Sequence, residues 1–143
     1  MSIPAAVVRL IRDEQERQNG RFIPPGDEYL PKLERAAELV CHEVAGECLG
    51  FVFFYCNAPE TGTSYITLLG VDPAARRRGV GTALVNYVLE VAGQRAFRWC
   101  RLEVDKDNSA AIRFYQRLGF EIVESRETRF LMQVEVARRH DQR

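Results

Sequence analysis

The chain has 143 residues, a length that suits one domain, so we expect a single domain over residues 1–143. Its hydrophobic share of 46% and its charged share of 28% are those of a folded globular protein, which excludes an intrinsically disordered chain. The formal net charge of zero argues against a nucleic-acid binder, because such proteins gain affinity by neutralising phosphates.

Acidic and basic residues are divided unevenly along the chain. Residues 1–60 carry ten acidic and six basic side chains, whereas residues 61–143 carry ten acidic and fourteen basic ones. This division would suit an anionic cofactor on one part of the protein and a cationic acceptor on another. The alternative is a scatter of solvated charges.

The cysteines indicate a reducing environment. Cys41, Cys48, Cys56 and Cys100 lie in apolar stretches without Cys-x-x-Cys spacing, where a free cysteine behaves as a small hydrophobic residue. We therefore expect reduced thiols, no metal site and a cytoplasmic location. Charged residues interrupt the first fifteen positions and no apolar run is long enough to cross a bilayer, so we expect neither a leader nor a membrane partner.

The first part of the chain is predicted to form two helices and a strand. Apolar spacing predicts a helix over residues 5–18, and two prolines and a glycine predict a loop over 22–26. A second helix is expected to begin at 27 or 28, with apolar residues at Leu30, Leu33, Ala37 and Val40. A dense aromatic run predicts a buried strand over 47–56. The first strand of the sheet should be short, absent or supplied by another part of the protein.

Strands and helices are predicted to alternate in the rest of the chain. A turn leads to a strand over 65–71, antiparallel to the preceding one, and a helix over 79–94 crosses to a parallel strand over 99–104. The last elements are a helix over 108–118, with Ala111, Phe114, Tyr115 and Leu118 on its inner face, and strands over 120–123 and 128–136. This order predicts an α+β fold, an α/β sandwich with a mixed sheet.

The segment from Arg76 to Thr82 carries the clearest chemical signal. Gly79 and Gly81 alternate with one apolar residue where a strand passes into a helix, so backbone N–H groups can approach an anion closely. The helix start adds unpaired donors, and Arg76, Arg77 and Arg78 add positive charge. These features favour a diphosphate site. The alternative is a tight turn with solvated arginines.

The motif narrows the choice of cofactor. Leu84 stands where a dinucleotide fingerprint needs a third small residue, and no lysine is present for a nucleotide-triphosphate loop. Arg76-x-x-Gly79-x-Gly81, after a strand ending in Val-Asp-Pro, resembles the acetyl-coenzyme A motif of the GNAT superfamily. The stretch from Leu102 to Phe120, with its Asn, Ala, Tyr and Leu-Gly-Phe spacing, resembles the second motif of the same family.

The resemblance implies an N-acetyltransferase that uses acetyl-coenzyme A. In that family the pantetheine arm of the cofactor lies between two splayed parallel strands of a mainly antiparallel sheet flanked by helices. The cofactor-binding residues implied here are Leu69, Val71, Arg76, Arg77, Arg78, Gly79, Val80, Gly81, Thr82, Asn108, Ala111 and Phe114.

Two residues are candidates for catalysis. Tyr115 stands at the family's acid position and would protonate the departing thiolate, while its alternative role is core packing. Leu102-Glu103-Val104 is similar to a segment of ribosomal-protein N-terminal alanine acetyltransferases, in which the glutamate is the base. Glu103 would then accept the amine proton, or else pair with Arg101 on the strand surface.

The acceptor is expected to be a primary amine of a small molecule or peptide. In the family the acceptor pocket comes mainly from the first two helices, their loop and the final strands. The candidates here are Phe22, Tyr29, Tyr55 and Asn57. The loop around Phe22 could equally be a lid. The closing strands are also candidates for pairing with a second copy in a homodimer.

Two other functions remain open from the sequence. A catalytically silent member of the family would bind acetyl-coenzyme A as a sensor or scaffold. A basic nucleic-acid module built on Arg76, Arg77 and Arg78 is disfavoured by the net charge of zero.

Overall fold

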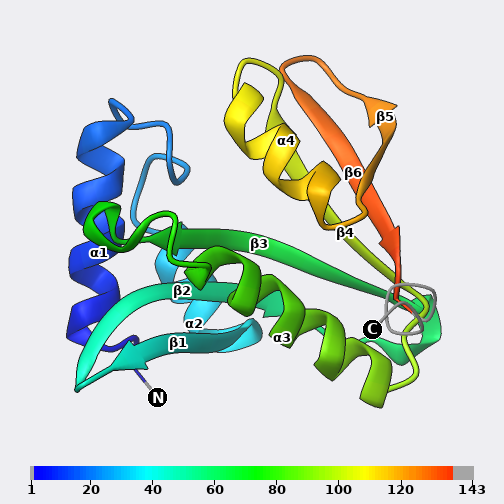
Figure 1. The fold of residues 1–143 in the computed structure, drawn as a ribbon, viewed down its shortest axis with the longest axis horizontal. Coiled ribbons are helices and arrows are strands. Elements are labelled where there is room, and N and C mark those ends of the chain that lie inside the picture. The colour runs from blue at the N-terminus through cyan, green and yellow to red at the C-terminus, as the bar shows by residue number, and fades with distance from the viewer. Residues whose placement is uncertain (1, 137–143) are drawn as a thin grey trace. The chain divides into compact units, whose positions relative to one another are not determined.

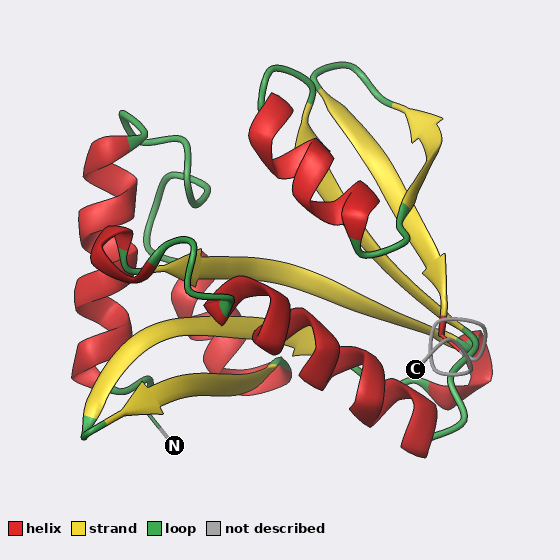
Figure 2. Ribbon diagram, in the orientation of Figure 1, coloured by secondary structure: helices red, strands yellow, loops and turns green. Residues whose placement is uncertain are grey.

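The computed structural model describes residues 2–136, which form a mixed α/β structure (Figures 1 and 2). The helices are α1 (Ala5–Arg17), α2 (Tyr29–Ala36), α3 (Val80–Gln94) and α4 (Ser109–Arg117). The strands are β1 (Glu38–Val44), β2 (Glu47–Tyr55), β3 (Thr63–Val71), β4 (Trp99–Asp105), β5 (Glu121–Ser125) and β6 (Arg129–Glu135). Two single-turn 3₁₀ helices, Pro59–Thr61 and Pro73–Ala75, flank β3.

The strands join in one sheet in the order β1-β2-β3-β4-β6-β5. The pairs β1–β2, β4–β6 and β5–β6 are antiparallel, and β3–β4 is parallel. The parallel register covers the first three residues of each strand, from Thr63 opposite Trp99 to Tyr65 opposite Arg101. A helix is the usual connection between parallel strands, and α3 provides it here. The predicted mixed, mainly antiparallel fold is therefore confirmed.

Residue contacts divide the chain into two compact units. Among the described residues, the first comprises 2–54 with 68–85, and the second comprises 55–67 with 86–136. Strand β3 and helix α3 each pass from one unit to the other along the sequence. A single domain over residues 1–143 stays a prediction.

The first unit is built around strand β2. Phe51, Phe53 and Phe54 are almost fully buried, and the rings of Phe51 and Phe53 meet edge to face with centroids 5.8 Å apart. Helix α1 buries Val7 and Ile11. Such a one-sided apolar face stabilises a helix through packing.

Two glycines allow β2, β3 and the start of α3 to approach closely in the first unit. A Cβ atom on Gly50 would lie 2.8 Å from Val80 Cγ1 and 3.0 Å from the Gly70 carbonyl oxygen. A Cβ atom on Gly70 would lie 2.5 Å from Phe51 Cε1. Beside them, the Asp72 N–H donates to the Leu49 carbonyl oxygen at 2.9 Å, so the end of β3 lies beside the beginning of β2, as expected of antiparallel strands. Side chains at these two glycines would force the backbones apart.

The second unit packs α4 with β4, β5 and β6. Strand β4 alternates buried and half-buried residues, as a strand with one covered face should. Asn108 caps α4, because its Oδ1 accepts the Ala111 N–H at 3.1 Å. The helix ends before Gly119, whose φ of +99° suits a glycine terminator. On the predicted inner face Tyr115 and Leu118 are buried, while Ala111 and Phe114 are half-buried.

One predicted helix is too long. The sequence pattern extended it over Ala37 and Val40, but α2 ends at Ala36 and both residues lie outside it, with Val40 in β1. The sequence signal that was missed is Gly46, which marks the turn between β1 and β2. Ala45 and Gly46 have φ values of +52° and +83° there. Two left-handed residues in a row are typical of a tight hairpin. Before α1, residues 2–4 form no strand, which answers a point that the sequence left open.

Candidate functional site

The loop before α3 is held rigidly at its first residues. The Asp72 carboxylate accepts the Ala74 N–H at 3.0 Å, and the Asp72 carbonyl oxygen accepts the Ala75 N–H at 2.8 Å. The Asp72 N–H is itself bonded to β2. Pro73 further restricts the backbone at this point. The chain therefore leaves β3 on a fixed path.

Two left-handed residues then turn the backbone towards the helix start. Arg77 has φ +70° and Gly79 has φ +77°, on either side of Arg78. Turns containing left-handed residues direct successive N–H groups to one side, where they can surround an anion. Both residues belong to the segment Arg76 to Thr82 that the sequence singled out. We call this segment the diphosphate loop, after the ligand that the sequence predicts for it.

Helix α3 supplies further N–H donors to the diphosphate loop. The Ala83 N–H donates to the Gly79 carbonyl oxygen at 2.9 Å. In a helix the earlier N–H groups, here those of Val80, Gly81 and Thr82, have no acceptor within the helix. They also lie at the positive end of the helix dipole, which favours a bound anion.

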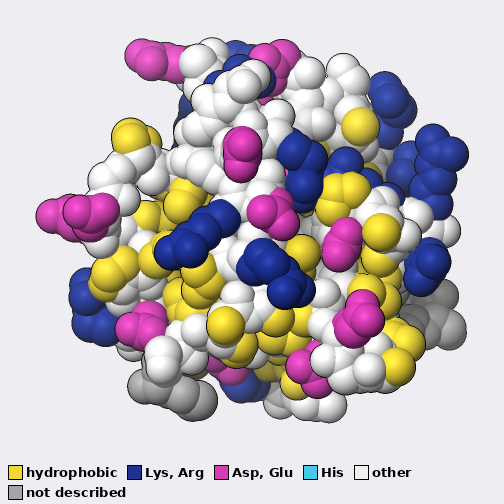
Figure 3. Space-filling view, turned by 90° about the vertical axis from the view of Figure 1, so that its left-hand side faces the viewer, with side chains coloured by type: hydrophobic (Ala, Val, Ile, Leu, Met, Phe, Trp, Pro, Cys, Tyr) yellow, Lys and Arg dark blue, Asp and Glu magenta, His cyan; other side chains and the backbone are white. Residues whose placement is uncertain are grey.

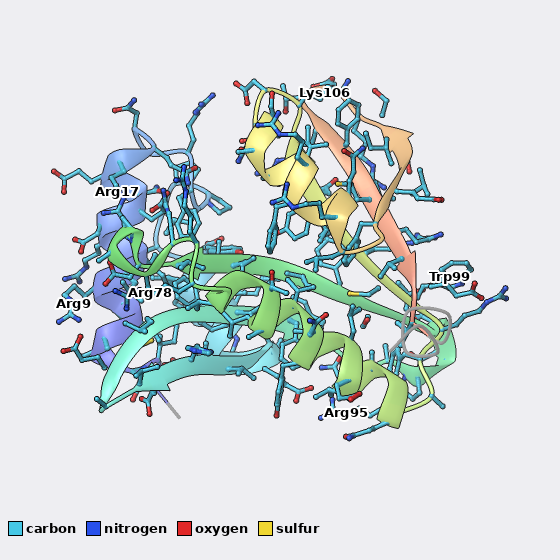
Figure 4. All side chains as sticks on the ribbon, viewed as in Figure 1. Arg9, Arg17, Arg78, Arg95, Trp99 and Lys106 are labelled. Carbon is cyan, nitrogen blue, oxygen red and sulfur yellow. The ribbon has the colours of Figure 1, made fainter. Side chains whose placement is uncertain are left out.

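The three arginines of the diphosphate loop are exposed, and one of them is fixed by an ion pair. Arg76 Nη2 lies 3.1 Å from Glu14 Oε1 on α1. Figure 4 marks Arg9 and Arg17 on α1 and Arg78 in the loop before α3. In the centre of the face drawn in Figure 3, basic, acidic and hydrophobic side chains are interspersed, and basic ones are more frequent towards its right-hand edge.

Leu69 and Val71 lie in the same compact unit as the diphosphate loop. Both are half-buried, and they alternate with the buried Leu68 and Gly70 along β3. Phe22 from the α1–α2 loop is near this strand, because a Cβ atom on Gly70 would lie 3.4 Å from Phe22 Cζ.

The second unit contains the other predicted cofactor and catalytic residues. Tyr115 is buried on α4, with ring centroids 5.0 Å from Phe114 and 5.6 Å from Phe120. Burial, and to a lesser extent the neighbouring Cys100 thiol, raises the pKa of Tyr115 well above its ordinary value. The phenol therefore stays protonated at neutral pH.

Glu103 lies on the half-exposed face of β4, within a network of ion pairs. Arg126 Nη1 contacts Glu103 Oε2 directly, and Arg129 Nη1 lies 3.6 Å from Glu103 Oε1. Arg129 also contacts Asp105, with 3.1 Å between Nε and Oδ1. Arg101 donates instead to Gln133 Oε1 at 2.7 Å, so the Arg101 pairing considered from the sequence does not occur.

The four acceptor candidates are divided between the two units. Phe22 and Tyr29 belong to the first unit and are half-buried. Tyr55 and Asn57 belong to the second, and partial burial raises the pKa of the Tyr55 phenol above its ordinary value. The loop that carries Phe22 is ordered by Gln15, which bonds both backbone groups of Ile23.

Comparison with known proteins identifies the family. Residues 7–120 match the model of the acetyltransferase (GNAT) family, which is most of the chain. The chain belongs to this family. An uncharacterized N-acetyltransferase of Methanocaldococcus jannaschii is 41% identical over 97 residues, which is 65% of this chain and 42% of that protein. A mycothiol acetyltransferase of a Mycobacterium species is 34% identical over 84 residues, 56% of this chain and 27% of the relative. The chain thus spans less than half the length of these relatives.

Solved structures of other GNAT proteins share the fold. Ard1 of Thermoplasma volcanium has a TM-score of 0.76 and 26% identity, with 93% of each chain covered. The ribosomal-protein-S18-alanine N-acetyltransferase of Escherichia coli has a TM-score of 0.75 and 19% identity, with 95% of this chain and 92% of that one covered. The expected fold family is therefore confirmed.

The described residues also bear on metals, disulfides and membranes. All four cysteines fall within residues 2–136 and are free thiols, as expected. Over the same residues, no cluster of three or more His, Cys, Asp or Glu side chains suits a metal ion. None of the helices described combines the length and apolar composition needed to span a bilayer.

Proposed function

We propose that this chain is an N-acetyltransferase that moves an acetyl group from acetyl-coenzyme A to a primary amine. The observation that carries the proposal is the diphosphate loop of a GNAT-family chain. Arg77 and Gly79 turn the backbone so that the open N–H groups at the start of α3 follow directly. A diphosphate matches these donors in charge and in hydrogen-bonding character.

The residues proposed to bind acetyl-coenzyme A belong to the diphosphate loop, to strand β3 and to helix α4 with its cap. The N–H groups of the diphosphate loop would hold the diphosphate, with Arg76, Arg77 and Arg78 adding charge. The backbone of Leu69 and Val71 would bond the pantetheine arm. Asn108 would bond the pantetheine arm, and Ala111 and Phe114 would pack near the cofactor.

The chemistry proposed is a direct attack by the amine. The amine nitrogen forms a bond to the thioester carbonyl carbon, the carbon–sulfur bond breaks, and the amine loses a proton. Tyr115 would give its phenolic proton to the departing thiolate, and its raised pKa keeps the phenol protonated until that step although it also makes the phenol a weaker acid. A backbone N–H near Leu69 would stabilise the oxyanion.

Glu103 is the proposed acceptor of the amine proton, directly or through water. Both of its carboxylate oxygens contact guanidinium groups. One of these ion pairs would have to loosen for the carboxylate to accept a proton.

A cationic small molecule or peptide is the proposed acceptor, with Phe22, Tyr29, Tyr55 and Asn57 as its contacts. The acidic composition of residues 1–60 supports this choice. The relatives named above include proteins named for mycothiol and for the alanine of ribosomal protein S18. These names set no acceptor for the present chain, so the test has to cover several classes.

The test measures free thiol release from acetyl-coenzyme A in the presence of amino acids, polyamines, amino sugars and peptides. Mass spectrometry of the acceptor then checks for the added acetyl group. We expect turnover with at least one amine, and its loss in Gly81→Trp, whose side chain would fill the diphosphate loop. Coenzyme A binding in calorimetry without turnover on any amine would instead indicate a catalytically silent sensor.

A further inference from the structure

A buried carboxylate on α1 lies in contact with the diphosphate loop. Glu14 is 9% exposed and, with Ser64, one of two buried polar residues within residues 2–136. Its Oε1 accepts bonds from Arg17 Nε and Nη2 at 3.0 and 2.8 Å and from Arg76 Nη2 at 3.1 Å. Its Oε2 accepts a bond from Gln18 Nε2 at 2.7 Å. Both oxygens of this buried carboxylate are therefore satisfied by donors.

The contact of Glu14 with Arg76 joins distant parts of the chain, unlike its contacts with Arg17 and Gln18. Arg17 and Gln18 lie one turn further along the chain, at the end of the same helix, so they alone could satisfy a carboxylate at this position. Arg76 lies 62 residues away in sequence and is the first residue of the diphosphate loop. Burial of a carboxylate is costly, and the ion pair compensates for it only when the partners are held in place. The contact therefore fixes Arg76 to α1.

The backbone around Arg76 shows what this fixing would achieve. Arg76 is extended, with φ −64° and ψ 148°, and the next residue is the left-handed Arg77. A non-glycine residue with positive φ is strained and persists only when its surroundings hold it. The Asp72 carboxylate holds the chain before this point, through its bond with the Ala74 N–H. Glu14 holds the side chain of the residue next to the strained one.

We propose that Glu14 is a positioning residue for cofactor binding, acting through Arg76 to hold the diphosphate loop in its anion-binding shape. The inference rests on the proposed function, because it assumes that the loop holds a diphosphate. Glu14 does not touch the cofactor in this scheme. Its contribution is the position of the Arg76 guanidinium and of the backbone that follows.

Positioning and simple charge predict opposite results for the neutral variant Glu14→Gln. Removal of a negative charge beside an anion site should strengthen binding of coenzyme A if charge alone matters. Loss of a charge-assisted hydrogen bond that positions the loop should weaken binding by about tenfold. The sign of the change therefore separates the two explanations.

The experiment compares wild type, Glu14→Gln, Arg76→Gln and the double variant by calorimetry with coenzyme A, and by kinetics with acetyl-coenzyme A. We expect Glu14→Gln to raise Kd and KM by about tenfold and to leave kcat unchanged. In the Arg76→Gln background the same change should have no further effect, because its partner is already absent. Glu16→Gln, which alters an exposed glutamate of the same helix, is the matched control and should bind as wild type does.

A shortened cosubstrate distinguishes positioning from general loss of structure. Acetyl-pantetheine lacks the diphosphate, so its KM should be the same for wild type and Glu14→Gln. An equal rise in KM for both cosubstrates would make Glu14 a merely structural residue and overturn the inference. Unchanged or tighter coenzyme A binding by Glu14→Gln would overturn it as well. Failure of the wild type to bind coenzyme A would overturn the proposed function, and the inference with it.

Discussion

Tyr115 is a residue whose surroundings favour one protonation state. It is buried on α4 between two aromatic rings, and burial raises the pKa of its phenol. A base at this position would be poor, whereas a proton donor is compatible with the neutral phenol. Core packing, the alternative role considered for Tyr115 from the sequence, would require the same burial.

The first prediction separates the two roles of Tyr115. Tyr115→Phe keeps the ring and removes the proton, so we expect kcat to fall by about 10²-fold with coenzyme A affinity unchanged. Steady-state kinetics and calorimetry make the comparison. Tyr87→Phe is the control, because Tyr87 is 50% exposed on α3 and its loss of the hydroxyl should change neither quantity. Weaker binding with unchanged turnover would assign Tyr115 to packing.

The second prediction concerns Glu103. Glu103→Gln should lower kcat by about 10²-fold if the carboxylate accepts the amine proton. Asp105→Asn is a matched control, since Asp105 lies on the same face of β4 and also pairs with Arg129. The kcat of Asp105→Asn should not change. Equal losses in both variants would show that the ion-pair network matters, and not the proton acceptor.

At the scale of an element, the diphosphate loop combines a rigid start with an unusual backbone. The Asp72 carboxylate and Pro73 fix its beginning, and two left-handed residues shape the part that leads into α3. Glycine accepts this conformation without strain, whereas for an L-residue with a side chain it costs about 1 kcal/mol or more. The loop should therefore be sensitive to substitution even where space is available.

The third prediction tests the backbone of this loop. A Cβ atom on Gly79 would meet nothing within 4 Å, so Gly79→Ala changes only the backbone preference at φ +77°. We expect the free energy of unfolding to fall by about 1 kcal/mol and coenzyme A binding to weaken. Gly62→Ala is the control, because Gly62 has φ +65° and is equally open but belongs to another turn. Denaturant unfolding should show similar losses for both, and calorimetry a binding defect for Gly79→Ala alone.

At the scale of the whole molecule, the stability of the fold at acid pH should depend on the protonation of Glu14. Burial raises the pKa of this carboxyl, but hydrogen bonds from Gln18 and Arg17 and the charges of Arg76 and Arg17 outweigh it and leave the pKa below its ordinary value. A carboxyl whose folded pKa is lower than its unfolded one stabilises the fold above the unfolded value. That stabilisation disappears as the pH falls through the folded pKa.

The fourth prediction follows from this sign. The free energy of unfolding should drop as the pH falls below the ordinary pKa of a glutamate, and Glu14→Gln should show a shallower drop. Urea unfolding at neutral pH and at about pH 3 measures both. Glu16→Gln serves again as control and should follow the wild type. Identical acid dependence in all three proteins would mean that other carboxyls dominate.

Local patterns predicted most of the fold, and the failures have a physical cause. Helices α1, α3 and α4 and strands β2, β3 and β4 each carry an apolar period or a distinct terminator, which a short window of sequence shows. Strand β1 is half-buried, so its weak pattern was absorbed into the preceding helix. The diphosphate loop was visible for the same local reason as the helices.

Long-range contacts were not visible in the sequence. Glu103 and Arg126 are 23 residues apart, and Glu14 and Arg76 are 62 apart. No local period marks such pairs, because they form only when strands or loops meet in the folded chain. The sequence could therefore name the residues of the candidate site but not the partners that hold them.

The close packing of Val80 and Phe51 against two glycines has a practical consequence for protein engineering. With a Cβ atom, Gly50 would collide with Val80 at 2.8 Å, and Gly70 would collide with Phe51 at 2.5 Å. A mutant library meant to change the acyl donor should leave both glycines untouched, since overpacking of this kind costs about 1–3 kcal/mol.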